Sequence, residues 1–314
     1  MKAAVINDFG GPEVFEIWEI DKPGIRENEL LIEVHGGSLN AIDWKQRKGN
    51  HKFIFGAPFP IVLGYDVSGI VVDTGAKIHN FKIGDQVCGV LSNTYGGGLG
   101  QFARGKESCF ALLDPSIPLT ESAALPLAGL TALQVLRDKA KLREGKSLLL
   151  IGAAGGVGHF ALQIAAIFGA EIHAVSSKKH KKFIEKLSAC RFIDYTEQNI
   201  GELPERFDVI FDTIGKYPFP KFKHLLNPGG IHINILPRPN IIWYKILSVI
   251  TRRKKARTHL MKHDPNDLNL LVKWTAEGKL KPAINRQFSL EEISDAHAYM
   301  EEGHTEGKIL IRYK

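Results

Sequence analysis

Cysteine is scarce in this chain, with only Cys88, Cys109 and Cys190 among 314 residues. Three cysteines so far apart form neither a disulfide framework nor a Cys-x-x-Cys metal knuckle, so we expect reduced thiols. Long apolar runs are missing too, because no uninterrupted apolar stretch approaches the roughly 18 residues that span a bilayer. Met1 runs directly into a strand-like segment, without the charged and apolar regions of a signal peptide. These absences predict a cytoplasmic protein.

Acidic residues are in the minority, since 34 of them face 41 lysines and arginines, which gives a net charge of +7. This balance slightly favours anionic ligands, and part of the excess is clustered at Lys178–Lys182 and Arg252–Arg257. No interleaving of basic and aromatic residues is present, so we expect a small-molecule substrate and no nucleic-acid partner. A hydrophobic content of 44% and the length are typical of a globular enzyme with two domains.

The most informative stretch is Leu148–Gly158, where four aliphatic residues precede a glycine-rich turn. The aliphatic run suits a strand that is buried on both faces, as in a parallel sheet. Gly152 allows the tight turn, Gly155 and Gly156 let a ligand approach the backbone, and Gly158 lets the next helix pack closely. Free N–H groups at the start of the helix, expected at Phe160–Phe168, suit a pyrophosphate. With a further strand behind it, this pattern predicts a dinucleotide site rather than an ordinary turn.

Short strands separated by turns fill the first hundred residues, which predicts a compact β domain. We expect these strands at Lys2–Asn7, Phe15–Ile20, Leu30–Gly36, Val67–Thr74 and Gln86–Leu91. A helix is expected at Glu121–Arg137, with Thr120 as its N-cap. From there on, strands alternate with helices, which is typical of a parallel sheet. The expected strands are Leu148–Ile151, Glu171–Val175, Arg191–Ile193, Val209–Asp212 and Gly230–Leu236. The tail holds helices at Asn266–Glu277 and Leu290–Glu302 and a last strand at Lys308–Arg312.

The end of the second strand of such a fold selects the cofactor. An acidic residue there holds the ribose hydroxyls of NAD, whereas cations and hydroxyls accept the 2′-phosphate of NADP. Here the strand is followed by Ser176-Ser177-Lys178-Lys179-His180-Lys181, without an acid. The sequence therefore predicts NADPH, held by Ser176 and at least one of the three lysines.

Several motifs now stand in a definite order along the chain: Asn40-x-x-Asp43-x-Lys45, Leu63–Gly69, Gly84–Val87, Ala153–Gly158 and Gly229-Gly230. In this order they resemble the zinc-independent medium-chain dehydrogenases/reductases, in the branch of quinone oxidoreductases and alkenal (enone) reductases. The resemblance covers nearly the whole chain. It implies an α/β fold with a GroES-like β-rich catalytic domain and a Rossmann domain built on a doubly wound parallel sheet. The first would take residues 1–124, completed by 264–314, and the second 125–263.

The resemblance also implies a set of cofactor-binding residues. The segment Asp194-Tyr195-Thr196 is similar to the chloroplast-type members, in which such a tyrosine helps to cover the 2′-phosphate. Thr131 lies in the segment that reaches the nicotinamide ribose. The full set is Thr131, Gly152, Ala154, Gly155, Gly156, Val157, Ser176, Ser177, Lys178, Lys181, Tyr195, Gly215 and Lys308.

The zinc-dependent alcohol dehydrogenases of the same superfamily hold a catalytic metal with a cysteine, a histidine and a second cysteine. By alignment of the motifs, this chain has Asn40 and Tyr65 at the first two positions and Ala124 near the third. The structural zinc loop with four cysteines is absent as well. A rival pair, His259 and His263, has the spacing of a zinc site on one helix face. Without a third ligand in view, we expect an exposed polar face there and no bound metal.

Without zinc, no Lewis acid is available to form an alkoxide from a simple alcohol. Hydride addition to a conjugated acceptor remains easy, because the charge spreads onto a distant oxygen that needs only hydrogen-bond donors. The candidate donors are the amide of Asn40 and the cation of Lys45, with Tyr65 as a third donor or a packing wall. The alternatives are a turn-stabilising role for Asn40 and a surface position for Lys45. Asp43 is expected to orient Lys45 or a backbone group.

These features predict an enzyme, expected as a homodimer, that reduces quinones or α,β-unsaturated carbonyls with NADPH. Two alternatives stay open. The same fold could reduce aldehydes or enoyl thioesters, or the chain could bind NADPH without catalysis, for instance in membrane trafficking.

The stretch Asn240–Arg257 is the least explained part of the chain. Its apolar residues recur at helical spacing and are followed by a basic cluster. We expect a helix that walls the cleft between the domains or forms a dimer interface. The alternative is an interfacial anchor that makes weak peripheral contact with an anionic membrane.

Overall fold

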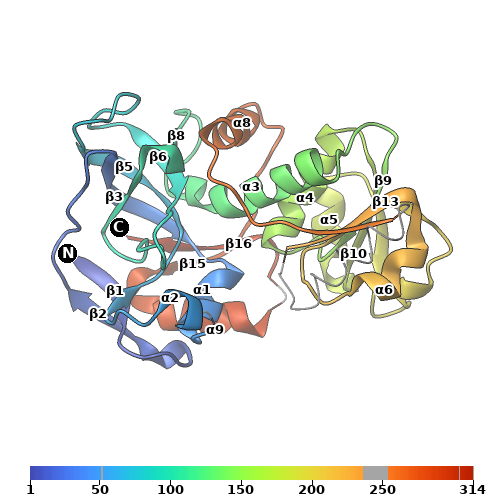
Figure 1. Cartoon of the computed structure of the whole chain (residues 1–314), viewed down its shortest axis with the longest axis horizontal. Helices are drawn as coiled ribbons and strands as arrows, with labels where there is room; N and C mark the ends of the chain where they lie inside the picture. Colours follow the sequence, from blue (N-terminus) through green and yellow to red (C-terminus); the bar gives the residue numbers. More distant parts are fainter. Residues whose placement is uncertain (51, 236–253, 304, 314) are drawn as a thin grey trace. The chain divides into compact units, whose positions relative to one another are not determined.

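The computed structural model describes residues 1–50, 52–235, 254–303 and 305–313. The chain forms two compact units, Met1–Leu130 with Lys262–Lys314, and Thr131–Met261 (Figure 1). The second unit is therefore an insertion into the first. The boundaries expected from the sequence were 124/125 and 263/264.

The inserted unit is built on six strands that all run parallel to one another. The strands are β9 (Ser147–Ile151), β10 (Glu171–Ser176), β11 (Arg191–Asp194), β12 (Phe207–Asp212), β13 (Leu226–Asn234) and β14 (Lys255–Thr258). Their order in the sheet is β11–β10–β9–β12–β13–β14, which is the order of the doubly wound dinucleotide-binding fold. Helices α4 (Gly156–Ile167), α5 (Lys181–Leu187) and α6 (Phe219–Phe222) connect these strands. The predicted α/β class with a doubly wound parallel sheet is confirmed.

The aliphatic run of β9 explains its central place in this sheet. Leu148, Leu149, Leu150 and Ile151 are all buried, as two-faced burial requires. Helix α4 begins at Gly156, four residues before the expected start, because the glycine turn leads directly into it.

The last strand of the sheet corrects one prediction. Lys255, Ala256 and Arg257, expected at the end of a helix, belong to β14. Ala256 is buried and its two neighbours are exposed, which is the period-two pattern of a strand. Residues 240–253 of the predicted helix lie outside the described residues.

The other unit contains two sheets. The smaller one has the order β2–β1–β4, and the larger one has the order β15–β16–β3–β5–β6–β8, with β7 paired to β3. The strands are β1 (Lys2–Ile6), β2 (Phe15–Glu19), β3 (Glu29–Ser38), β4 (Ile61–Val62), β5 (Asp66–Thr74), β6 (Gln86–Val90), β7 (Phe102–Lys106), β8 (Phe110–Leu112), β15 (Ile284–Ser289) and β16 (Lys308–Arg312). The five strands predicted in the first hundred residues are all present.

The helices of this unit are α1 (Ala41–Arg47), α2 (Lys52–Phe55), α3 (Pro126–Gln134, which runs on past the unit boundary), α8 (Pro265–Ala276) and α9 (Ile293–Glu302). The single helix expected at Glu121–Arg137 is in fact three pieces, a 3₁₀ turn at Glu121–Ala124, then α3, then a π turn at Val135–Lys139. Pro126 opens α3 because it lacks an N–H and fits the first helical position. Thr120 is not an N-cap, since its backbone is already helical and its side chain makes no capping bond. None of the described helices is long and apolar enough to cross a bilayer.

Candidate functional site

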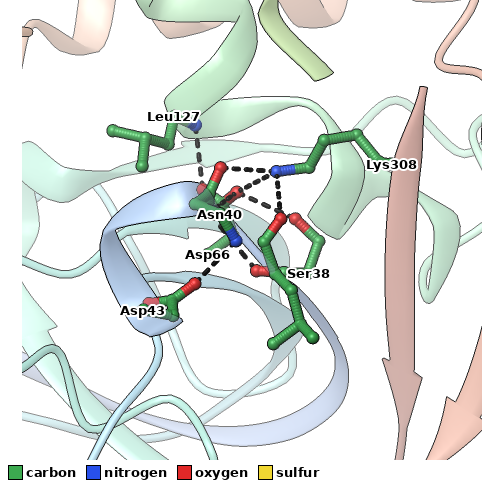
Figure 2. A network of polar contacts seen from close by, with 7 residues as sticks. Ser38, Asn40, Asp43, Asp66, Leu127 and Lys308 are labelled. Atoms are coloured by element: carbon green, nitrogen blue, oxygen red, sulfur yellow. Dashed lines mark hydrogen bonds and ion pairs between the residues drawn. The ribbon is translucent and has the colours of Figure 1, made fainter. Parts of the chain in front are cut away.

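A buried carboxylate, Asp66 at the start of β5, is the centre of the polar site in the first unit. Figure 2 shows the donors that converge on it. Ser38 Oγ and Asn40 Nδ2 each donate to Asp66 Oδ2 at 2.8 Å, and Lys308 Nζ forms an ion pair with the same oxygen at 3.1 Å. The N–H of Leu127, in the first turn of α3, donates to Oδ1 at 2.8 Å. Asp66 thus ties together β3, α1, α3 and β16.

Asn40 has its side chain fully occupied within the protein. Its Nδ2 group donates to Asp66 and, at 3.3 Å, to the Ser38 carbonyl, while its Oδ1 accepts from Lys308 at 2.6 Å. No amide hydrogen is left for a substrate oxygen, so this arrangement speaks against Asn40 as an oxyanion donor. It favours the structural alternative, because Asn40 also stands at the N-cap of α1.

Tyr65 is engaged in a similar way. Its hydroxyl donates to the Thr94 carbonyl at 2.6 Å and accepts from Gln46 Nε2 at 2.7 Å. Burial raises the pKa of Tyr65 to about 12. Since its hydrogen is used by Thr94, Tyr65 suits the role of a packing wall better than that of a donor.

Lys45 differs from the other two candidates. It lies in α1, is half-buried, and has its ammonium 5.5 Å from the centre of the Trp44 ring. Among the described residues it has no hydrogen-bond or ion-pair partner. Burial lowers the pKa of Lys45. A desolvated ammonium with free hydrogens is what a developing oxyanion needs.

Asp43 serves the backbone. Its Oδ2 accepts from the N–H of Asn40 at 2.7 Å, which completes a capping box at the start of α1. Burial raises the pKa of Asp43 to about 7. The expectation that Asp43 orients a backbone group therefore agrees with its geometry, two residues before Lys45.

Lys308 does not have the geometry of a cofactor ligand. Its ammonium is buried and has three acceptors, namely Asn40 Oδ1, Asp66 Oδ2 and, at 3.0 Å, the Leu39 carbonyl. An ammonium has three hydrogens, so none remains for another partner.

The second unit carries the glycine turn. Gly152 follows β9 with φ +81°, a conformation that favours glycine. A Cβ at Gly158 would lie closer than 3.0 Å to the Gly152 carbonyl, so only glycine lets α4 pack against the turn. A Cβ at Gly155 would meet only ordinary contact with the protein, and no side chain caps α4. The remaining predicted residues of this turn, Ala154, Gly156 and Val157, lie in it or open the helix. The turn therefore fits a pyrophosphate at the helix N-terminus.

One organiser of this region was missed. Asp212, at the end of β12, is fully buried. Its Oδ1 accepts from the N–H groups of Ile214 and Gly215, and its Oδ2 from the N–H of Tyr217 at 2.8 Å. Asp212 shapes the turn that contains the predicted residue Gly215, whose φ is +77°. A lone acid at the end of a buried strand was the only signal in the sequence.

The predicted residues after β10 lie beside acids that the sequence did not place near them. Ser176 is buried and pairs in register with Asp194 of β11, and the N–H of Tyr195 donates to the Ser176 carbonyl. Lys178 forms an exposed ion pair with Glu197 at 2.8 Å. The Ser177 hydroxyl is buried and has no hydrogen-bond partner among the described residues.

Lys181 pairs with Glu185 at 3.8 Å along α5. Thr131 is buried within α3. Lys181 and Thr131 complete the set of predicted cofactor-binding residues, and for both of them this role stays a prediction.

The rival metal pair does not form. His259 and His263 lie in a non-helical segment, so they do not share a helix face. The expectation of exposure is wrong for His259, which is buried with its Nε2 atom 3.1 Å from Gln134 Oε1. Among the described residues, no group of three or more His, Cys, Asp and Glu side chains is arranged to hold a metal ion.

Two protein families match the chain. The Alcohol dehydrogenase GroES-like domain matches residues 26–113, and the family described as Zinc-binding dehydrogenase matches residues 187–311. The first accounts for the β-rich unit and agrees with the predicted GroES-like domain.

Similar proteins extend over the full length. The chain is 34% identical to the chloroplast envelope quinone oxidoreductase homolog of Arabidopsis thaliana, over 99% of this chain and 98% of that protein. It is 32% identical to the chloroplastic NADPH-dependent alkenal/one oxidoreductase of the same plant, over 99% and 79%. The solved quinone oxidoreductase of Coxiella burnetii superposes with a TM-score of 0.93 at 30% identity, over 100% of this chain and 99% of that chain.

Proposed function

Because the chain belongs to the medium-chain dehydrogenase/reductase family, in its zinc-independent branch of quinone oxidoreductases and alkenal reductases, we propose that it transfers hydride from NADPH to a quinone or an α,β-unsaturated carbonyl. Membership of this family makes the chain an oxidoreductase that uses a nicotinamide cofactor. A bound nicotinamide supplies the hydride. The protein's own task is to hold the cofactor and to stabilise the enolate or hydroquinone oxygen that gains the charge.

The observation that carries this proposal is the uncommitted ammonium of Lys45. Hydride addition to a conjugated acceptor creates an oxyanion several bonds away from the reacting carbon. Asn40 and Tyr65 use their hydrogens inside the protein, whereas Lys45 has no hydrogen-bond or ion-pair partner among the described residues. Of the three candidates, we therefore assign the oxyanion contact to Lys45.

The preference for NADPH is supported by the region after β10. The orphaned hydroxyl of Ser177, the cations of Lys178 and Lys181, and the exposed Tyr195 ring suit a phosphate on the adenosine ribose. Glu197 and Glu185 already neutralise the two lysines in part. A 2′-phosphate would have to compete with these exposed pairs, which are individually weak.

The test compares two lysines of the same helix end. Lys45→Ala should lower kcat for an enone about 10- to 100-fold, the cost of losing a partly solvated oxyanion donor. Lys48→Ala is the matched control, because Lys48 also lies near the Trp44 ring, at 5.1 Å, but is paired with Glu301. The control should keep wild-type turnover, and both variants should keep the NADPH affinity of the wild type.

A substrate panel completes the experiment. NADPH oxidation is followed by absorbance with a quinone, an enone and a saturated aldehyde. Turnover of the aldehyde alone would refute the proposed substrate class. Wild-type turnover by Lys45→Ala would show that the oxyanion is stabilised by another group.

A further inference from the structure

The least expected feature of the first unit is the buried lysine at the start of its last strand. The Lys308 side chain is 2% exposed, and its three hydrogens go to Leu39 O, Asn40 Oδ1 and Asp66 Oδ2 at 2.6 to 3.1 Å. Burying an ammonium is costly unless it is paired and hydrogen-bonded. Here every hydrogen has an oxygen acceptor, and one acceptor is a carboxylate.

All three acceptors stand at the beginning of α1 or hold it in place. Leu39 and Asn40 immediately precede the helix, and Asp66 accepts from the Asn40 amide. Asn40 in turn donates its backbone N–H to Asp43, which closes the capping box (Figure 2). A helix of seven residues has little stability of its own, so its first turn depends on these contacts.

We propose that Lys308 is a positioning residue: its ammonium fixes Asn40, and through Asn40 it sets the first turn of the helix that carries Lys45. This inference rests on the proposed function, since it assigns Lys308 to the oxyanion contact rather than to the cofactor. The oxygen cluster around the ammonium has the charge of one carboxylate, which a single lysine neutralises.

A double-mutant cycle tests the link. Lys308→Met should lower kcat for an enone at least tenfold, while the NADPH Kd stays within twofold of the wild type. Adding Lys45→Ala in this background should cause little further loss, because Lys308 acts through Lys45. If the kcat losses of Lys308→Met and Lys45→Ala multiply in the double variant, the proposal is overturned. It is also overturned if Lys308→Met raises the NADPH Kd and leaves kcat unchanged, which would assign Lys308 to the cofactor site. If Lys45→Ala is silent by itself, the proposed function has failed instead.

A second variant guards against simple misfolding. Lys308→Met leaves the buried Asp66 carboxylate without its ion-pair partner, whereas Lys308→Met combined with Asp66→Asn removes both charges of this buried pair. The double variant should fold and still show the loss of kcat with wild-type NADPH affinity. Full activity in the folded double variant would contradict the positioning role.

Chemical rescue adds a readout that a merely structural role would not move. The variant Lys308→Ala leaves room for a small amine beside Asp66. Ethylammonium should restore kcat in a saturable way, and ethanol, which has a similar size but no charge, should not. Lys77→Ala, at an exposed lysine paired with Glu27, is the control and should not respond. A folded Lys308→Ala that ethylammonium leaves unchanged would refute the proposal.

Discussion

The buried histidine of α9 predicts how the first unit responds to acid. His297 is fully buried, packs on the Phe15 ring with 4.6 Å between centroids, and has no hydrogen-bond partner for either ring nitrogen among the described residues. Burial, with a contribution from the Arg47 guanidinium, lowers the pKa of His297 from its ordinary 6.5 to about 3. The folded unit therefore keeps this ring neutral in mildly acidic solution, whereas the unfolded chain protonates it.

The sign and the size follow from linkage. A base whose folded pKa lies below its unfolded pKa stabilises the fold fully above about pH 6.5 and loses that contribution as the pH falls toward 3. At pH 5 the loss amounts to about 2 kcal/mol relative to pH 7.5. Asp43 works in the opposite direction, because its pKa is raised to about 7 and its neutral form favours the fold at lower pH. The comparison must therefore be made between variants, in which the Asp43 contribution cancels.

The substitution His297→Phe keeps the ring and removes the titrating group. Urea unfolding should be followed by tryptophan fluorescence, since three of the four tryptophans, Trp18, Trp44 and Trp274, belong to this unit. When the pH is lowered from 7.5 to 5, the free energy of unfolding should fall by about 2 kcal/mol less for His297→Phe than for the wild type. The exposed His79, changed to Gln, is the control and should follow the wild type. Equal pH responses of His297→Phe and the wild type would refute the reasoning.

Three further predictions concern the cofactor and metals. Gly158→Ala should lower both the stability and the NADPH affinity, because its Cβ meets the Gly152 carbonyl. Gly155→Ala should lower only the NADPH affinity, measured by fluorescence titration. Equal behaviour of the two variants would contradict the assignment of the turn. NADPH should bind at least tenfold more tightly than NADH, since a charge-assisted hydrogen bond is worth about 1.5–3 kcal/mol, and joint replacement of the lysines at 178, 179 and 181 by alanine should remove most of this difference. Identical affinities of the wild type for the two cofactors would argue against a phosphate site. Elemental analysis should find no stoichiometric zinc; one tightly bound zinc per chain, with activity lost to chelators, would reverse that expectation.

Local patterns predicted the first five strands of the inserted unit, because these elements carry their own signals, but they missed β14. The aliphatic run of β9, the glycine turn and α4 follow one another within twenty residues, so periodicity and glycine placement suffice. Strands β4, β7, β8, β14 and β15 were not predicted. The sequence of β7, Phe-Ala-Arg-Gly-Lys, lacks an apolar alternation, and its place is decided by pairing with β3.

The polar partners of the site were beyond the reach of sequence patterns. Asn40 Nδ2 donates to Asp66 across a separation of 26 residues, and Asn40 Oδ1 accepts from Lys308 across 268, so partners far along the chain occupy this side chain. The acid beside the end of β10 comes from the neighbouring strand, where register places Asp194 opposite Ser176. The role proposed for Lys45 depends on its lacking such partners among the described residues, which the local motif alone could not show.

The insertion of one unit into the other has a consequence for synthesis on the ribosome. Strand β16 lies between β15 and β3, so the sheet of the first unit stays open until Lys308–Arg312 are made. At about 5–20 residues per second, the interval between Leu130 and Lys308 lasts roughly 10–35 s, which is long compared with the folding of a small domain. During this time Thr131–Met261 is synthesised in full, while Asp66 still lacks its partner Lys308 and β3 still lacks its neighbour β16. The dinucleotide-binding unit can therefore fold before the sheet around β16 is completed.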